Sequence, residues 1–159
     1  MYFEHLVVVN EPGNPLVEPL TLAQLWNGLV LRAEAPDLFL EHIESVRILE
    51  RGPGTLLREI ELGVLTVRDR ITLTPHQSVH HVTEASDQHE GGTLTISIEV
   101  PEEEQLLVRF VYDTPVPEHD PAAGEGEANY AAYLKAAYQQ MDVEALKKVR
   151  QMAEQGELG

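Results

Sequence analysis

Two oppositely charged side chains are the first candidates for chemistry in this sequence. Arg58 and Asp69 are the charged residues on the apolar faces of two consecutive predicted strands, and the short turn between the strands sets them directly opposite each other. Because charges are costly to bury, such a pair either forms a structural ion pair or orients a polar group of a bound ligand. We therefore take Arg58 and Asp69 as candidate ligand-binding residues, with the structural pair as the alternative.

Adjacent histidines follow on the next predicted strand, residues 79–85. Side chains alternate between the two faces of a strand, so either His80 or His81 faces inward, and the pattern of this strand leaves the choice open. An inward histidine would lie diagonal to Asp69, and an Asp–His pair can act as a general base toward an acidic carbon or hydroxyl. Asp69 and His81 are therefore the catalytic candidates if the protein is an enzyme. Otherwise the histidine is a polar residue in solvent.

Aromatic residues are candidates for the walls of a binding cavity, because each ring offers a large apolar area and tyrosine adds a polar tip. Five are predicted to contact a ligand: Trp26, Phe110, Tyr112, Tyr130 and Tyr133. The alternative for each of them is ordinary packing in the core. Tyr130 and Tyr133 are the stronger candidates, since they begin a predicted helix directly after residues 114–129, a connector or lid rich in proline, glycine and acid.

The sequence does not indicate a metal or cofactor site. Histidine and acidic residues stand together in predicted loops at residues 87–90 and 118–120, but neither group has the spacing of a known metal site. The chain has no cysteine, which excludes disulfides and thiolate chemistry. No glycine-rich loop leads into a helix that could hold a phosphate. We expect neither a metal nor a cofactor.

Composition narrows the classes of partner. The chain has 159 residues, of which 43% are hydrophobic and 24% charged, and this suits one globular domain with a substantial core. Its formal net charge of −16 would repel nucleic-acid phosphates and anionic membrane surfaces. The start of the sequence lacks the features of a signal peptide and no apolar run is long enough to span a membrane, so we expect a cytoplasmic protein. No interface signal is evident, and we expect a monomer or a weak dimer.

An alternating strand pattern positions the candidate residues. The strands predicted over residues 56–62 and 65–73 are joined by a two-residue turn that begins with Gly63, which suits type II′. This register places Glu59 opposite Arg68 on the face that does not carry the first charged pair. Further strands are predicted over residues 2–9, 42–51, 79–85, 93–100 and 106–112.

Helical segments flank these strands. Thr21 and Gln24 form a capping box for a helix that ends before Pro36, and residues 37–40 are predicted to form one further helical turn. The longest regular segment, residues 128–153, is predicted to be an amphipathic helix. Its apolar stripe consists of residues spaced three and four apart, Tyr130, Leu134, Ala137, Met141, Ala145, Val149 and Met152.

The order of the elements predicts the fold. A strand is followed by two short helices, then by about six strands and a long helix, and the links between the strands are too short for parallel crossovers. We therefore predict an α+β fold in which a curved antiparallel sheet of about seven strands wraps around the C-terminal helix. The space between helix and sheet would be the place for a small molecule.

Several stretches of the chain are similar to one known family. They are Asn14-Pro15-Leu16, Leu20-Thr21, Gln24-Leu25-Trp26-Asn27-Gly28-Leu29, Arg32-Ala33-Glu34, Pro36, Ile48-Leu49-Glu50-Arg51-Gly52, Thr66-Val67-Arg68-Asp69-Arg70 and Arg109-Phe110-Val111-Tyr112. With them the sequence resembles the START-like, birch-pollen-allergen-like superfamily (SRPBCC), and within it the branch named after the acetylaranotin biosynthesis cluster protein L. The resemblance covers nearly the whole chain and implies a helix-grip fold with a hydrophobic cavity, in one ligand-binding domain over residues 1–159. It implies no particular reaction, because the superfamily includes lipid carriers, hormone receptors, polyketide cyclases and oxygenase domains.

Three functions follow as hypotheses. The first is binding of a small hydrophobic molecule, lipid-like or polyketide-like, in a cavity between the sheet and the C-terminal helix. The second is a polyketide cyclase or aromatase-like enzyme that uses Asp69, Arg58 and an inward histidine in the same cavity. The third is a protein-interaction module whose cavity has collapsed. The first requires a cavity large enough for a ligand, and the second also requires a histidine that points into it.

Overall fold

The computed structural model describes residues 1–14, 16, 18–118 and 130–159, and its main feature is one antiparallel sheet. The sheet has seven strands in the order β1-β7-β6-β5-β4-β3-β2. The strands are β1 (Tyr2–Asn10), β2 (Ser45–Gly52), β3 (Thr55–Leu62), β4 (Leu65–Thr74), β5 (Ser78–Thr83), β6 (Gly92–Glu99) and β7 (Leu106–Asp113). Every neighbouring pair is antiparallel, which confirms the predicted sheet.

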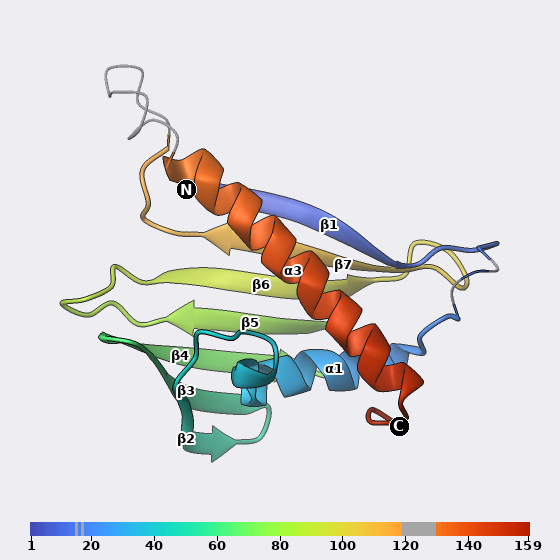
Figure 1. Ribbon diagram of the computed structural model, residues 1–159, viewed down its shortest axis with the longest axis horizontal. Helices are drawn as coiled ribbons and strands as arrows, with labels where there is room; N and C mark the ends of the chain where they lie inside the picture. The colour runs from blue at the N-terminus through green and yellow to red at the C-terminus, as the bar shows by residue number, and fades with distance from the viewer. Residues whose placement is uncertain (15, 17, 119–129) are drawn as a thin grey trace.

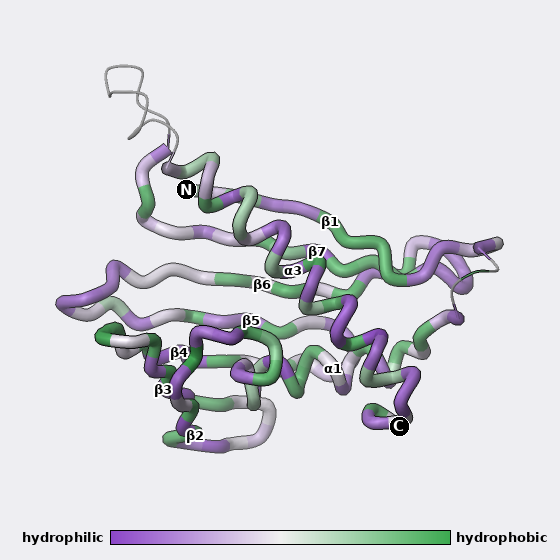
Figure 2. The backbone as a smooth tube through the Cα atoms, viewed as in Figure 1, coloured by the Kyte–Doolittle hydropathy of each residue, from purple (hydrophilic) through white to green (hydrophobic). Residues whose placement is uncertain are grey.

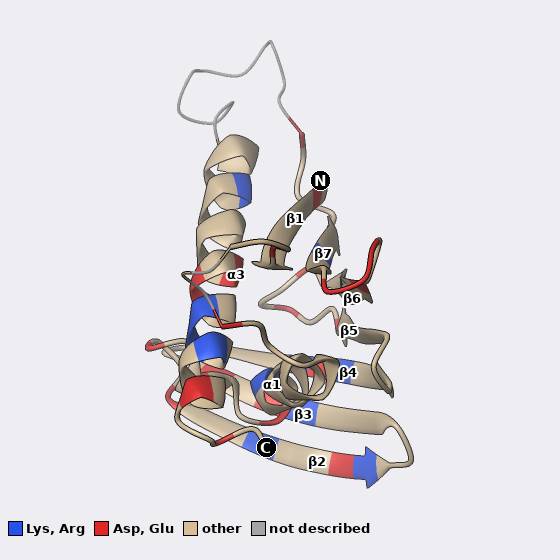
Figure 3. Cartoon of the chain, turned by 90° about the vertical axis from the view of Figure 1, so that its right-hand side faces the viewer, with Lys and Arg blue, Asp and Glu red and all other residues tan. Residues whose placement is uncertain are grey.

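Two α-helices lie against one face of this sheet. The long helix α3 (Tyr130–Glu154) runs diagonally across the strands (Figure 1). The helix α1 (Leu22–Glu34) packs against the C-terminal part of α3. Viewed from the side, the sheet curves around both helices (Figure 3). The two helices approach closely at Gly28 of α1, where an added Cβ would lie 2.5 Å from Cγ1 of Val149 in α3. The predicted helix-grip fold is confirmed.

The β3–β4 hairpin has the register that its turn predicts. Arg58 pairs with Asp69, and Glu59 pairs with Arg68. Gly63 has a φ of +64°, the positive value that the first central residue of a type II′ turn requires. Since successive side chains point to opposite faces, the first pair lies on the helix-covered side of the sheet and the second on the other side.

The capping box predicted for α1 is present, with both of its hydrogen bonds at 3.0 Å between Thr21 and Gln24. The helix ends at Glu34, before Pro36, as expected. The further helical turn expected over residues 37–40 is instead a short 3₁₀ turn, η1 (Pro36–Leu38). Proline suits the first position of a helical turn, because the backbone N–H at that position forms no hydrogen bond within the helix and proline lacks one. Pro36 therefore begins this turn as well as ending α1.

The buried face of α3 agrees with the prediction only in the C-terminal half of the helix. There Ala145 is buried as expected, together with Val149 and Met152. In the N-terminal half, Tyr130 and Ala137 were expected to be buried but are exposed. Residues one position later take the inward places, Ala131 and Tyr138. The segment 130–138 is so rich in alanine and tyrosine that it offers two apolar stripes, and spacing alone does not distinguish them.

The core lies between the sheet and the two helices. Its largest fully buried apolar side chains come from both helices and from four strands: Phe110, Leu25, Leu29, Ile71, Ile96, Val79, Val108 and Val149. In Figure 2, α3 alternates between hydrophobic and hydrophilic positions along its length, as expected for a helix with one buried face. No helix in the described part of the chain is both long and apolar enough to cross a bilayer.

Candidate functional site

A pocket of about 500 Å³ lies between the inner face of the sheet and the N-terminal half of α3. Its apolar lining includes Leu40, Leu94, Tyr112, Tyr130, Tyr138 and Met141. Its polar lining includes Arg32, Arg58, Asp69, His81 and Thr83. Residues 88–93, between β5 and β6 and at the start of β6, and residues 114–117, after β7, complete the lining. The pocket therefore joins apolar walls to a group of charged and polar side chains.

Arg58 and Asp69 form a buried ion pair in this lining. Nε and Nη2 of Arg58 donate to Oδ2 of Asp69 at 3.0 and 2.9 Å, and the hydroxyl of Thr83 in β5 donates to Oδ1 at 2.6 Å. Nη1 of Arg58 donates to the backbone carbonyl of Ala33, in the last turn of α1, at 2.7 Å. Burial lowers the pKa of Arg58, and the Asp69 carboxylate opposes this effect. The pair connects three strands to α1, and both carboxylate oxygens are already hydrogen-bonded.

His81 is the histidine that faces the pocket. It is only 4% exposed, whereas Nδ1 of His80 lies 2.8 Å from the hydroxyl of Thr95. Nε2 of His81 is buried and has no hydrogen-bond partner among the described residues. Burial, followed by the positive charges of Arg58 and Arg32, lowers the pKa of His81 well below its ordinary value. The ring is therefore neutral at pH 7, and a neutral imidazole can exchange a proton with a bound molecule.

Asp142 of α3 is a second buried charge beside the pocket, and the sequence analysis did not identify it. The residue is 0% exposed, and its Oδ2 accepts a hydrogen bond from the Tyr112 hydroxyl at 2.7 Å. Nε2 of His5 in β1 lies 2.8 Å from the same oxygen. Burial raises the pKa of Asp142, and the opposing effects come from Arg32, Tyr112 and His5. One carboxylate thus ties α3 to β1 and β7.

Arg32 of α1 stands between these two polar clusters. Its guanidinium lines the pocket and lies 3.7 Å from Oδ1 of Asp142, an oxygen that has no hydrogen-bond partner within the described residues. That separation is too long for a hydrogen bond, and no other described group accepts one from the guanidinium. The backbone carbonyl of Arg32 accepts one from Nη1 of Arg58 at 3.4 Å. Arg32 is 9% exposed, and its guanidinium nitrogens are not among the buried atoms that lack a partner, so the donors that the described protein groups do not use still reach the solvent in the pocket.

The sequence did contain a signal for both of the residues that were missed. Arg32 follows Leu25 and Leu29 at spacings that place the three on one side of α1. Asp142 precedes Ala145 and Val149 in the same way on α3. A charge within an apolar stripe is the signal that singled out the strand pair Arg58–Asp69, and applied to the helices it identifies these two residues as well.

The five aromatic residues predicted to contact a ligand are divided by the structure. Tyr112 and Tyr130 line the pocket. Trp26 and Phe110 are buried in the hydrophobic core and are not part of the pocket lining. Tyr133 is 69% exposed and also lies outside the lining, because α3 turns this position toward solvent.

The predicted loop groups of acids and histidine do not converge on a metal centre. Among the described residues, no three histidine or acidic side chains are arranged to hold a metal ion. His89 lines the pocket, and its Nδ1 accepts a hydrogen bond from the backbone of Gly91 at 2.8 Å. The group at 118–120 lies partly outside the described residues.

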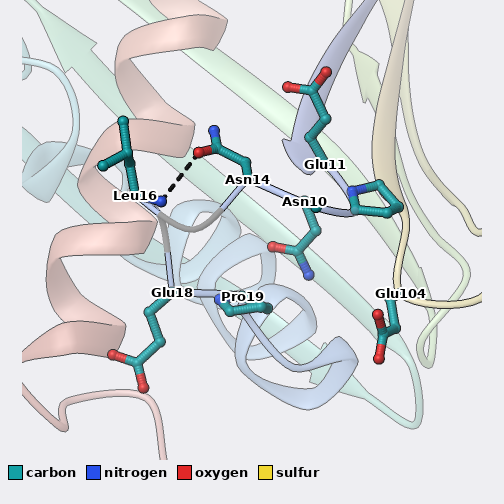
Figure 4. Close-up of a pocket in the computed structure, with 9 residues that line it drawn as sticks. Asn10, Glu11, Asn14, Leu16, Glu18, Pro19 and Glu104 are labelled. Atoms are coloured by element: carbon teal, nitrogen blue, oxygen red, sulfur yellow. Dashed lines mark hydrogen bonds between the residues drawn. The ribbon is translucent and has the colours of Figure 1, made fainter.

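A second hollow, of about 590 Å³, lies at the end of β1, bordered by the loop after that strand and by Glu104 (Figure 4). Its one buried polar side chain is Asn10. Nδ2 of Asn10 donates to the carbonyl of Leu20 at 2.7 Å, and its Oδ1 accepts from the N–H of Leu20 at 2.9 Å. Both ends of this amide hold the loop through hydrogen bonds, so among its described lining residues the hollow has no unpaired buried polar side chain for a ligand.

Comparisons with known proteins agree with this geometry. The sequence model of the family described as acetylaranotin biosynthesis cluster protein L matches residues 7–156. No curated protein matches the chain. Among solved structures, the Zhui aromatase/cyclase from Streptomyces sp. R1128 superposes with a TM-score of 0.62 and 20% identity, covering 97% of this chain and 93% of that one.

Two further solved structures share the fold. The di-domain ARO/CYC protein BexL from the BE-7585A biosynthetic pathway has a TM-score of 0.65 and 15% identity, and the match covers 97% of this chain and 50% of that one. A START superfamily protein from Mycobacterium smegmatis has a TM-score of 0.55 and 13% identity, with 93% and 98% covered. At these identities the likeness concerns the fold alone.

Proposed function

Because the chain belongs to the acetylaranotin biosynthesis cluster protein L family and has a START-like fold, we propose that it binds a small hydrophobic molecule between the sheet and α3. The observation that carries the proposal is the pocket of about 500 Å³ with aromatic walls. The rings of Tyr112 and Tyr138 stack there with centroids 4.4 Å apart. Pockets of this volume suit molecules of drug size, whose apolar body contacts the walls.

A lipid-like or polyketide-like ligand suits this pocket, since such molecules combine a large apolar body with a few oxygen atoms. The apolar part would lie against Tyr112, Leu94 and Met141, and the oxygen atoms would face the polar side of the lining. Arg58 and Asp69 would contribute to ligand binding mainly through the shape they give the pocket wall and the electric field of their charges. Their hydrogen bonds are already made within the protein.

Native mass spectrometry of the protein purified from its own host tests the proposal. We expect a stoichiometric added mass, which solvent extraction would then identify. Met141→Trp, which fills the pocket, should remove that mass, whereas Gln140→Trp, one position along α3 on an exposed site, should retain it. If a folded Met141→Trp variant kept the same bound molecule, the ligand would lie elsewhere and the proposal would be wrong.

A second candidate is a cyclase or aromatase-like enzyme that acts in the same pocket, and His81 favours it. A buried, neutral imidazole with an unpaired Nε2 suits a general base that removes a proton from an acidic carbon. The nearby guanidinium groups of Arg32 and Arg58 would stabilise the enolate that forms. The enolate carbon would attack a second carbonyl of the same chain, and the hydroxyl so formed would leave as water. His81→Gln should then abolish ring closure and loss of water from a poly-β-ketone thioester, with His80→Gln as the matched control. Equal turnover by both variants would remove this candidate.

The third alternative, a protein-interaction module, requires a collapsed cavity. The pocket of about 500 Å³ weighs against it. Nothing else in the described surface favours a particular protein partner.

A further inference from the structure

Two pocket groups keep polar atoms that the described protein groups do not use. The guanidinium of Arg32 donates no hydrogen bond within the described residues, and Nε2 of His81 is buried without a partner. The neighbouring side chains of Arg58 and Asp69 do have partners. Arg58 donates hydrogen bonds to Asp69 and to a backbone carbonyl at the end of α1, and Asp69 also accepts one from Thr83. Buried polar groups are almost always hydrogen-bonded, and Nε2 of His81 is an exception. The unused donors of Arg32 belong to the lining of the same pocket, so a ligand that reaches both residues would complete their hydrogen bonds.

The charge on Arg32 indicates which kind of ligand group would bind it. Its nearest anionic group, Asp142, stands 3.7 Å away and directs its other oxygen to Tyr112 and His5. A guanidinium presents a planar fork of donors that matches a carboxylate or a delocalised enolate. A neutral oxygen would satisfy one donor, whereas an anion would also balance the charge.

We propose that the ligand carries an acidic group, a carboxylate or an acidic enol, which binds the Arg32 guanidinium with Nε2 of His81 as a second hydrogen-bond partner. This inference rests on the proposed function and specifies the ligand class of the same pocket. The acidic group would pair with Arg32 at hydrogen-bonding distance, whereas Asp142 stands 3.7 Å away and forms no hydrogen bond with it. Asp142 is therefore a competitor for Arg32, and removing its charge should strengthen binding of the acid.

The test uses a neutral reporter and a matched pair of probes. N-phenyl-1-naphthylamine, an uncharged dye that fluoresces in apolar sites, reports occupancy of the pocket. Naphthalene-1-acetate and naphthalene-1-acetamide, which share one skeleton and differ in charge, are then compared as competitors. We expect the acid to bind at least about tenfold more tightly than the amide, the ratio that one charge-assisted hydrogen bond supplies.

The variants assign this preference to named residues. Arg32→Gln should bring the acid-to-amide ratio to near one, with both competitors measured against the dye affinity of the same variant, and Asp142→Asn should increase the ratio. Arg51→Gln is the matched control, because it removes the same charge from an exposed arginine outside the pocket, and it should keep the ratio of the unaltered protein. If Arg32→Gln does not fold, Arg32→Lys, which keeps the charge but loses the planar fork, should give an intermediate ratio.

The outcomes separate this inference from the function on which it rests. Absence of dye binding, together with absence of any naphthalene binding, would overturn both. Dye binding with equal affinities for acid and amide would overturn only the acidic-ligand inference and leave the pocket as a neutral hydrophobic site. A preference for the acid that survives Arg32→Gln would also overturn it, because the anion would then be bound elsewhere.

Discussion

Replacing Arg58 by methionine is the sharpest test of how the pocket is held together. Methionine keeps an unbranched, apolar side chain but removes the two hydrogen bonds to Asp69 and those to the backbone carbonyls of Ala33 and Arg32. Asp69 would then remain buried with Thr83 as its hydrogen-bond donor. Breaking a buried ion pair by removing one partner costs about 3–5 kcal/mol of unfolding free energy, and we expect a loss in that range. Stabilities of whole domains are about 5–15 kcal/mol, so the variant should remain measurable.

Urea unfolding followed by the fluorescence of Trp26, the one tryptophan in the sequence, measures this loss. A double-mutant cycle with Asp69→Leu separates pairing from packing. The double variant should lose less than the sum of the two single variants, by about 0.5–3 kcal/mol, because it leaves no buried charge unpaired. A cost below about 1 kcal/mol for Arg58→Met, or strict additivity in the cycle, would refute the view that this pair fastens α1 to the sheet.

Two further predictions concern the helix contact and the buried histidine. Alanine is normally better than glycine inside a helix by about 1 kcal/mol, yet Gly28→Ala should lower the thermal unfolding midpoint, since its Cβ would lie 2.5 Å from Cγ1 of Val149. Adding Val149→Ala should restore part of the loss, and a stabilised single variant would contradict the contact. His81 has a lowered pKa in the folded state, so the unfolded chain binds more protons and stability should fall as the pH drops below the ordinary value of 6.5. His81→Gln should flatten this slope relative to His80→Gln, and identical slopes would show that the buried ring does not resist protonation.

The strands were predictable because two independent constraints agreed. Alternation of apolar residues fixed which faces of β3 and β4 are buried, and the two-residue turn at Gly63 fixed how they pair. Together they place Arg58 opposite Asp69 from the sequence alone. The pairing of β4 with β5 was less constrained, because the turn before β5 is longer, and the inward position of His81 had to come from the structure.

The helices were less predictable because a helix has no partner register to fix its rotation. A difference of one position moves a side chain by about 100° around the axis. In α3 this was enough to expose Tyr130 and to place Tyr138 against Tyr112. Asp142 was missed for a related reason, since the stripe was defined by apolar residues and a charge within it was not counted. The partners of that charge, Tyr112 and His5, come from the last and the first strand, 30 and 137 residues away from Asp142 in the sequence, and no local pattern brings them together.

The cluster of Arg58, Asp69 and Thr83 and the cluster of Asp142 and Arg32 differ in how many of their hydrogen-bonding atoms have a partner. This difference indicates different roles for the two clusters. In the cluster of Arg58, Asp69 and Thr83 the carboxylate oxygens are both hydrogen-bonded, so its perturbation should act on stability. The cluster of Asp142 and Arg32 leaves Oδ1 of Asp142 without a hydrogen bond, and each buried group of this kind costs about 1–3 kcal/mol. An acidic ligand on Arg32 would leave that oxygen unpaired but would give a partner to Nε2 of His81, which is also buried without one, and by binding only the folded state it would stabilise the fold. Substitution of Arg32 should therefore reduce the stabilisation given by an acidic ligand more than it reduces the stability of the empty protein, and substitution of Arg58 should do the reverse.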